Sequence, residues 1–229
     1  MGRYVIATTK SWNINNYKEL ISAFPNEEFE LITEKEQLTR QFLDEIKPKY
    51  VFFPHWSWLI PKEIYENFEC VVFHMTDLPF GRGGSPLQNL IVRGIYDTKV
   101  SAIKVESGID TGPVYMKELI NISIGNVEEI LGCVSNIVFK KMIPCFINNE
   151  VCAVQQEGEV VSFKRRTPED SRIPEGLSER QLYDYIRMLD GEGYPKAYKD
   201  VGDVRMYFSN ARLTDEGVCA DVNIIRRSE

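Results

Sequence analysis

Two side chains in this sequence, those of His74 and Asp110, have the types and the settings that proton transfer requires. His74 follows Cys70–Phe73, a continuous apolar run that is typical of a strand buried on both faces. Asp110 lies between two glycines, just after a second apolar segment at Lys99–Val105. A carboxylate beside an imidazole fixes the tautomer of the ring and raises its basicity, which general-base catalysis needs. The sequence therefore predicts a proton-transfer pair.

The residues after His74 predict where this pair lies in the fold. Gly81–Gly84 is a glycine-rich loop whose backbone can approach a ligand closely. Ser85 then predicts a helix N-cap, with a proline at the first helical position and Gln88 closing a capping box. Ligands bind at the carboxyl ends of strands in open α/β sheets. We therefore expect the site here, with adjacent parallel strands bringing Asp110 to His74.

These motifs resemble those of the folate-dependent formyltransferases, which include the methionyl-tRNA, glycinamide-ribonucleotide and nucleotide-sugar enzymes. The resemblance rests on His74 and on three short matches, Leu78-Pro79, Arg82-Gly83 and Asp110-Thr111-Gly112. It extends from residue 1 to about residue 200. One departure affects the chemistry: the family has an asparagine two residues before the histidine, and this chain has Val72 there.

The resemblance implies formyl transfer from 10-formyltetrahydrofolate to an amine, without a metal. His74 is then the base or the donor to the oxyanion, and Asp110 holds and polarises it. Valine donates no hydrogen bond, and losing such a donor costs roughly 100- to 1,000-fold in turnover. Asn89, on the first turn of the predicted helix, is a candidate substitute, although a surface amide there is an equally good interpretation.

The resemblance also assigns the binding residues. The loop that follows Tyr50–Phe53 is expected to border the pterin, although its two tryptophans would equally serve to cover an edge of the core. A polar loop at residues 8–16 is expected to contact the acceptor. The expected folate-binding residues are His55, Trp56, Trp58, Arg82, Gly83, Ser107, Gly108 and Ile109, and the expected substrate-binding residues are Lys10, Trp12 and Asn13.

Strand-like and helix-like segments alternate along the first part of the chain, which predicts an α/β fold with a doubly wound, mostly parallel, Rossmann-like sheet. A helix beginning at Asn126 is apolar on one face and is expected to end or kink at Pro144. From Val151 the sequence changes to short strands, turns and charged residues. We therefore expect a catalytic domain at 1–150 and a small β-rich C-terminal domain at 151–229.

Composition narrows the setting. The net charge of −7 argues against a nucleic-acid partner, since neutralising phosphates dominates such binding. Five cysteines without a CxxC pair are most simply buried thiols in a reducing compartment, and they offer no metal cluster with the histidines. No apolar run looks long enough to span a bilayer, so we expect a cytoplasmic protein without a membrane partner.

The leading hypothesis is a nucleotide-sugar N-formyltransferase that acts on a UDP- or dTDP-linked 4-amino-4,6-dideoxy sugar. The Val72 variant followed by residues 73–86 looks most like enzymes of pseudaminic-acid-type surface-sugar pathways. The expected partners are the nucleotide-linked amino sugar and folate, and a homodimer is one expected assembly. Two alternatives remain open: hydrolysis of formyl-folate, and a folate-binding module without turnover.

Overall fold

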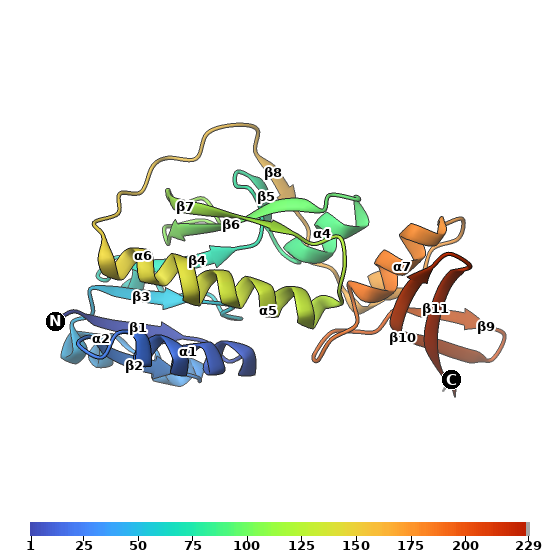
Figure 1. Cartoon of the computed structure of the whole chain (residues 1–229), viewed down its shortest axis with the longest axis horizontal. Coiled ribbons are helices and arrows are strands. Elements are labelled where there is room, and N and C mark those ends of the chain that lie inside the picture. The colour runs from blue at the N-terminus through green and yellow to red at the C-terminus, as the bar shows by residue number, and fades with distance from the viewer. Residues whose placement is uncertain (228–229) are drawn as a thin grey trace. The chain divides into compact units, whose positions relative to one another are not determined.

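A computed structural model describes residues 1–227 of the chain. Within this part the main sheet is six-stranded (Figure 1). Its spatial order is β2 (Glu28–Ile32), β1 (Arg3–Ala7), β3 (Tyr50–Phe53), β4 (Cys70–His74), β6 (Asp97–Lys104) and β7 (Val114–Asn121). β1 pairs in parallel with both β2 and β3, and β3 pairs in parallel with β4. The predicted doubly wound α/β fold is confirmed, and β2, β1, β3 and β4 form its parallel part.

β6 is the exception to the predicted parallel pairing. It runs antiparallel to β4, with His74 opposite Ser101 and Val71 opposite Lys104. The expectation that adjacent parallel strands bring Asp110 to His74 is therefore wrong. β6 and β7 are joined as a hairpin, with a hydrogen bond of 2.9 Å from Lys104 N to Pro113 O. The intervening loop, residues 105–112, is the segment that carries Asp110.

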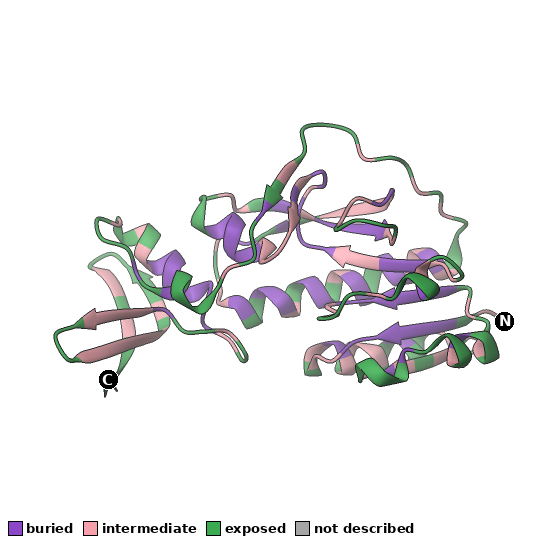
Figure 2. Ribbon diagram, turned by 180° about the vertical axis from the view of Figure 1, so that it is seen from behind, coloured by how far each residue is buried: buried purple, intermediate pink, exposed green. Residues whose placement is uncertain are grey.

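Helices cover both faces of the sheet because alternate strand residues point to opposite sides. On one face Val51 and Phe53 pack with Leu43 of α2 (Arg40–Ile46) and with Ile64 of α3 (Lys62–Tyr65). On the other face the ring of Phe52 lies 5.2 Å, centroid to centroid, from that of Phe146 in α6 (Ile143–Asn148). Figure 2 shows buried residues concentrated along these strands.

α1 (Ser11–Ala23) begins earlier than the sequence indicates. Residues 8–16 were expected to form a polar loop, but the helix includes Trp12 and Asn13 in its first turn. The side-chain amide of Asn13 donates hydrogen bonds to Thr8 Oγ1 at 2.8 Å and to Pro54 O at 3.1 Å. A polar residue can lie in a buried helix when its side chain donates to a backbone carbonyl elsewhere in the fold. Polarity alone therefore predicted a loop where the chain forms a helix.

The helix predicted from Asn126 is capped as expected. Asn126 Oδ1 accepts from Glu129 N at 3.0 Å, and Glu129 Oε2 accepts from Asn126 N at 2.8 Å. Pro144 neither ends nor breaks it: α5 (Val127–Ile137) continues through a π-helical turn (Val138–Met142) into α6. A wider π turn accommodates the missing proline N–H and its ring without stopping the helix.

The continuous helix Val127–Asn148 passes a length and hydropathy test for a membrane span, contrary to the expectation that no run would. Half of its apolar window is buried inside the protein (50%). Its apolar residues include Ile130, Leu131 and Phe146, each less than 5% exposed. The apolar character is therefore that of a core helix.

The C-terminal part contains a three-stranded antiparallel sheet of β9 (Tyr198–Val201), β10 (Val204–Thr214) and β11 (Gly217–Arg226). This sheet matches the expected β-rich appendage. It is preceded by a 3₁₀ turn (Pro168–Ser171) and by α7 (Glu179–Arg187), where Ser178 and Gln181 form a capping box. A further 3₁₀ turn (Lys35–Gln37) precedes α2.

The capping box expected at α4 (Pro86–Val92) is absent among the described hydrogen bonds. Ser85 has a left-handed backbone (φ 50°), and its Oγ accepts from Arg166 N at 3.1 Å. Gln88 Nε2 donates to Met188 O at 3.2 Å. The preceding glycine-rich segment is also a strand, β5 (Phe80–Gly83), which pairs with β8 (Val161–Phe163). The side chains of Ser85 and Gln88 therefore bond to residues far along the chain instead of to each other's backbone.

Contacts divide the chain into two compact units. The first contains residues 1–82, 99–120 and 132–162, and the second contains 83–98, 121–131 and 163–229. Segments from the middle of the sequence thus join the C-terminal residues. The predicted division at residue 150 stays a prediction about domains.

All five cysteines are free thiols in the described residues. Cys70 is buried, and burial raises its pKa to about 12. Cys133, Cys152 and Cys219 are exposed, so the expectation of uniformly buried thiols is wrong.

Phe52 is expected to anchor the core of the first unit. Its side chain is fully buried and contacts the rings of Tyr4, Tyr50 and Phe146. Phe52→Ala should lower the free energy of unfolding by about 3–5 kcal/mol, because it leaves a cavity that the sheet cannot fill. Urea denaturation followed by circular dichroism measures this. The exposed Val160→Ala is the control, and an equal effect of the two changes would contradict the assignment.

Candidate active site

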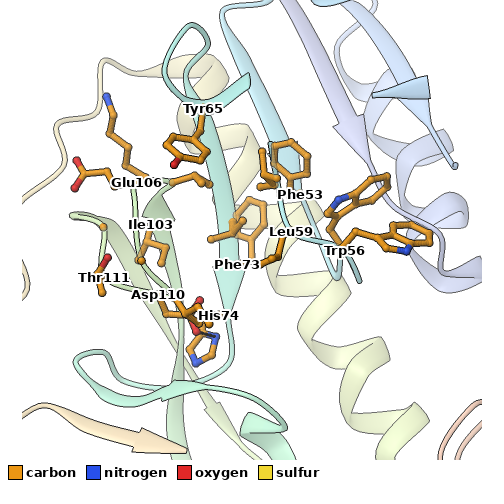
Figure 3. Close-up of a pocket in the computed structure, with 18 of the residues that line it drawn as sticks. Phe53, Trp56, Leu59, Tyr65, Phe73, His74, Ile103, Glu106, Asp110 and Thr111 are labelled. Atoms are coloured by element: carbon orange, nitrogen blue, oxygen red, sulfur yellow. Dashed lines mark ion pairs between the residues drawn. The ribbon is translucent and has the colours of Figure 1, made fainter. Parts of the chain in front are cut away.

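The first unit contains a cavity of about 510 Å³ at the carboxyl ends of β3 and β4 (Figure 3). Its wall comes mainly from the two strand ends, the loop after β3 and the loop that carries Asp110, with the ends of α3 and β6. A cavity of this volume is in the usual range for a small-molecule site. The candidate residues that line it are His55, Trp56, Trp58, Val72, His74, Gly108, Ile109 and Asp110.

His74 is held in one orientation by its surroundings. Only 8% of the residue is exposed, and its Nε2 lies 2.8 Å from the carbonyl oxygen of Gly81. Because a carbonyl only accepts hydrogen bonds, Nε2 must carry a proton. The other ring nitrogen, Nδ1, lies 3.5 Å from Asp110 Oδ2. Two acceptors cannot face each other favourably, so a proton belongs between Nδ1 and the carboxylate.

The Asp110 loop reaches His74 by folding back from the end of β6. Gly112 allows this because a Cβ there would overlap the carbonyl oxygen of Lys104. Asp110 itself has a left-handed backbone conformation (φ 55°), which is uncommon for a residue with a side chain. In Figure 3 the side chains of His74 and Asp110 lie together, away from the aromatic wall around Trp56. The sequence-predicted pair is thus brought together, although by a different route.

A further residue, Gln156, contacts the Asp110 loop, and sequence reasoning missed it. Its Nε2 donates to Asp110 O at 2.8 Å and to Gly112 O at 2.7 Å. Its Oε1 accepts two hydrogen bonds from Arg82, from Nε at 3.1 Å and from Nη2 at 2.8 Å. Arg82, expected to bind folate, is therefore used by this contact and does not line the cavity.

The loop after β3 forms the aromatic wall. The rings of Trp56 and Trp58 lie 4.8 Å apart, edge to face, and Trp56 also packs against Phe53. The loop therefore covers an edge of the core and also lines the cavity, so its two expected roles are compatible. The indole Nε1 of Trp56 is buried without a hydrogen-bond partner in the described residues. Burial and Lys10 lower the pKa of His55 to about 4, so its ring is neutral at pH 7.

The remaining expected binding residues lie outside the cavity wall. Trp12 contacts the ring of His55 at 5.9 Å, with Lys10 over its other side at 5.7 Å. Asn13 is buried by its backbone contacts. Ser107 accepts from Thr111 Oγ1 at 3.2 Å within the loop. In the second unit, Gly83 packs so closely that a Cβ would meet the carbonyl oxygen of Phe163.

Asn89, the candidate substitute for the family asparagine, also lies in the second unit. Its amide nitrogen donates to the carbonyl oxygens of Gly84, Ser85 and Lys164, at 3.1, 3.0 and 3.0 Å. Its Oδ1 accepts from Arg93 Nη1 at 2.9 Å. The amide is therefore used by the backbone, and these contacts favour a structural role. Val72 lines the cavity in place of an amide.

Several wall residues were not expected to belong to the site. Phe53 and Phe73 are strand-end residues whose apolar character indicated only core, and Tyr65 comes from the short helix α3, which gave no signal. The others come from the strand and loop around Asp110 and from the loop after β3: Leu59, Ile60, Ile103, Lys104, Val105, Glu106, Thr111 and Gly112. Among the described residues, no group of three or more metal-ligating side chains is present.

Comparison with known proteins identifies the family of the chain. A family model described as the C-terminal domain of methionyl-tRNA formyltransferase matches residues 168–225. The structure of methionyl-tRNA formyltransferase from Clostridium thermocellum is 50% identical, with a TM-score of 0.95 over 99% of this chain and 100% of that chain. The methionyl-tRNA formyltransferase of Campylobacter lari is 29% identical over 153 residues, which are 65% of this chain and 50% of that protein.

More distant structures share the fold. HypX from Aquifex aeolicus in complex with tetrahydrofolic acid has a TM-score of 0.75 at 16% identity, over 94% of this chain and 38% of that chain. A 4-N formyltransferase from Francisella tularensis has a TM-score of 0.68 at 14% identity, over 100% of this chain and 98% of that chain.

The chain therefore belongs to the formyltransferase family. It resembles the methionyl-tRNA formyltransferases in particular, and it spans about half the length of the Campylobacter lari relative (50%).

Gly112 should tolerate no side chain. Gly112→Ala is expected to lower the free energy of unfolding by about 1–3 kcal/mol, because the new Cβ must displace either the Asp110 loop or the end of β6. Gly132→Ala is the matched control, since a Cβ there meets nothing within 4 Å. Gly132 lies inside α5, so replacing it with alanine should raise the free energy of unfolding by about 1 kcal/mol. Chemical denaturation compares them, and a stabilising Gly112→Ala would refute the close approach.

Asn89→Ala should affect stability and not turnover. The change leaves the carbonyls of Gly84 and Lys164 short of a donor, whereas Ser85 O keeps the backbone N–H of residue 89. It is expected to cost about 1–3 kcal/mol of unfolding free energy. The kcat of the folded protein should remain close to that of the original. Denaturation and steady-state kinetics on the same sample measure both quantities. A large fall in kcat with unchanged stability would instead restore Asn89 as a donor in the reaction.

Proposed function

We propose that this protein transfers a formyl group from 10-formyltetrahydrofolate to the amine of a nucleotide-linked amino-deoxy sugar. The observation that carries the proposal is the His74–Asp110 pair, 3.5 Å apart, in the wall of a 510 Å³ cavity. An amine acceptor must lose a proton during acyl transfer, and such a pair provides a place for it.

The residues of the cavity fit a folate. Trp56, Trp58 and Phe53 provide an apolar aromatic wall against which a pterin ring can pack. The buried indole N–H of Trp56 lacks an acceptor in the described residues, and a polar ring edge would supply one. The loop backbone at Gly108 and Ile109 lies in the same wall. When bound, formyl-folate supplies the electrophilic formyl carbon.

The hydrogen bonds divide the chemical roles between the two residues. Nε2 of His74 donates to Gly81 and is not free to accept a proton. His74 therefore acts through the proton between Nδ1 and Asp110, and it provides positive character for the developing oxyanion. The Asp110 carboxylate takes the proton that the amine loses when its nitrogen bonds to the formyl carbon. Because Nε2 and Nδ1 are both engaged, His74 has no free N–H to donate to the oxyanion, and it acts there through its positive character.

The proposed acceptor class is supported by charge and by fold. With a net charge of −7, the chain lacks the excess of basic residues that tRNA phosphates favour. The fold of the Francisella tularensis 4-N formyltransferase aligns over 98% of that chain. The acceptor is then a 4-amino-4,6-dideoxy sugar on UDP or dTDP, of the pseudaminic-acid-pathway type. The free thiols fit a cytoplasmic setting.

Methionyl-tRNA is the second candidate acceptor. The specific observation in its favour is the 50% identity to the Clostridium thermocellum structure, which carries the name methionyl-tRNA formyltransferase.

A direct assay separates these candidates. The protein is incubated with 10-formyltetrahydrofolate and either a panel of nucleotide-linked amino sugars or methionyl-tRNA, and formylated products are detected by mass spectrometry. We expect formylation of a sugar. Formylation of the tRNA alone, steady release of formate without an acceptor, or folate binding without any product would each contradict the proposal. The last two results correspond to a hydrolase and to a binding module.

Two variants test the assigned roles in the same assay. His74→Asn and Asp110→Asn should each lower kcat by about 100- to 10,000-fold, because each removes one half of the proton-transfer pair. Folate binding should change little, since neither substitution alters the aromatic wall. The matched control is Asp215→Asn, which makes the same change at an exposed carboxylate outside the cavity wall. Activity of either site variant equal to that of the control would remove the pair from the mechanism.

A further inference from the structure

Gln156 forms hydrogen bonds with both of its side-chain polar atoms. The residue lies in the segment between α6 and β8, where it is partly buried while its neighbours Gln155 and Glu157 are exposed. The backbone is held nearby, since Val154 and Val114 exchange two hydrogen bonds of 2.8 and 2.9 Å. The side chain thus leaves a fixed backbone and points to the Asp110 loop.

The chemistry of its partners fixes the orientation of the Gln156 amide. Carbonyl oxygens only accept, so the atom facing Asp110 O and Gly112 O must be the nitrogen. A guanidinium only donates, so the atom facing Arg82 must be the oxygen. All four hydrogen bonds agree on one orientation, and rotating the amide by 180° would break all of them. Arg82 therefore orients Gln156, and Gln156 holds the loop.

The held atoms are adjacent to the reacting group. Gln156 binds the carbonyls of Asp110 and Gly112, which are on either side of Thr111. Asp110 is in a left-handed conformation that needs support from its surroundings (φ 55°). A small displacement of this backbone would move the carboxylate from its position 3.5 Å from His74 Nδ1.

We propose that Gln156 is a positioning residue, which Arg82 orients and which keeps the Asp110 carboxylate against His74. Its expected effect on turnover rests on the proposed formyl transfer, whereas its effect on His74 does not. Gln156 does not line the cavity, so its contribution acts through Asp110. Arg82 has the same indirect role in this proposal, and the expectation that it binds folate stays a prediction.

Gln156→Glu tests this with little change in shape. A glutamate still accepts from Arg82, but its other oxygen faces two carbonyl oxygens and repels them. We expect kcat to fall by about 100-fold with little change in the KM of either substrate, because misplacing a reacting group by about 1 Å costs that much. Gln155→Glu adds the same charge at an exposed neighbour and is the matched control.

A second readout needs no substrate. The chain has two histidines, His55 and His74, so the ring-nitrogen NMR signals are assigned with one variant, His55→Gln. Gln156→Glu should change the Nδ1 signal of His74 and leave that of His55 unchanged. Gln155→Glu should change neither. If Gln156→Glu does not fold, Gln156→Met, which keeps the length and removes the donors, provides the same comparison.

The activity assay and the NMR comparison distinguish failure of the proposed function from failure of the positioning role. If no acceptor is formylated by the original protein, the proposed function fails, and the NMR comparison still decides the role of Gln156. If Gln156→Glu matches Gln155→Glu in both kcat and the His74 signal, the positioning role is overturned. A loss of stability without a change in the His74 signal would also overturn it, because that result describes a structural residue.

Discussion

The hydrogen bond between His74 Nε2 and the carbonyl oxygen of Gly81 is the interaction on which the site depends. It is 2.8 Å long and joins the end of β4 to the start of the next strand, β5. Because the carbonyl can only accept, the bond decides which ring nitrogen carries a proton and turns Nδ1 toward Asp110. The geometry of a backbone turn thereby sets the protonation pattern of a side chain.

The antiparallel direction of β6 has a second consequence for the site. Parallel strands would place the loop before Asp110 at the same sheet edge as His74. Here β6 ends at Lys104, opposite Val71 and not His74. The loop must therefore return toward the carboxyl end of β4 to reach His74. A loop that returns in this way has few neighbours in its own sequence to hold it. The packing of Gly112 against Lys104 and the contacts of Gln156 provide that support. Long-range contacts therefore replace the order that a strand end would supply.

The sequence predicted most of the first unit because its signals are local. Apolar runs identified β1, β3 and β4, and the capping pattern at Asn126 and Glu129 located the start of α5. The predictions failed where a partner lies far along the chain. Asn89 donates to Lys164 O, and Gln156 joins Arg82 to the Asp110 loop, contacts that no local pattern reports. The prediction of a polar loop around Asn13 failed for a similar reason, because the side chain donates to Pro54 O at the end of another strand.

The distribution of charge in the cavity limits which residues can take part in proton transfer. His55 also lines the wall, but with a pKa lowered to about 4 it stays neutral through the physiological range. Lys104, another wall residue, is paired with Glu69 at 2.9 Å. A neutral aromatic wall suits an uncharged ring, whereas a shared proton suits a reacting amine. The separation of these two environments within one cavity fits a histidine that forms wall at position 55 and one that belongs to the proposed proton-transfer pair at position 74.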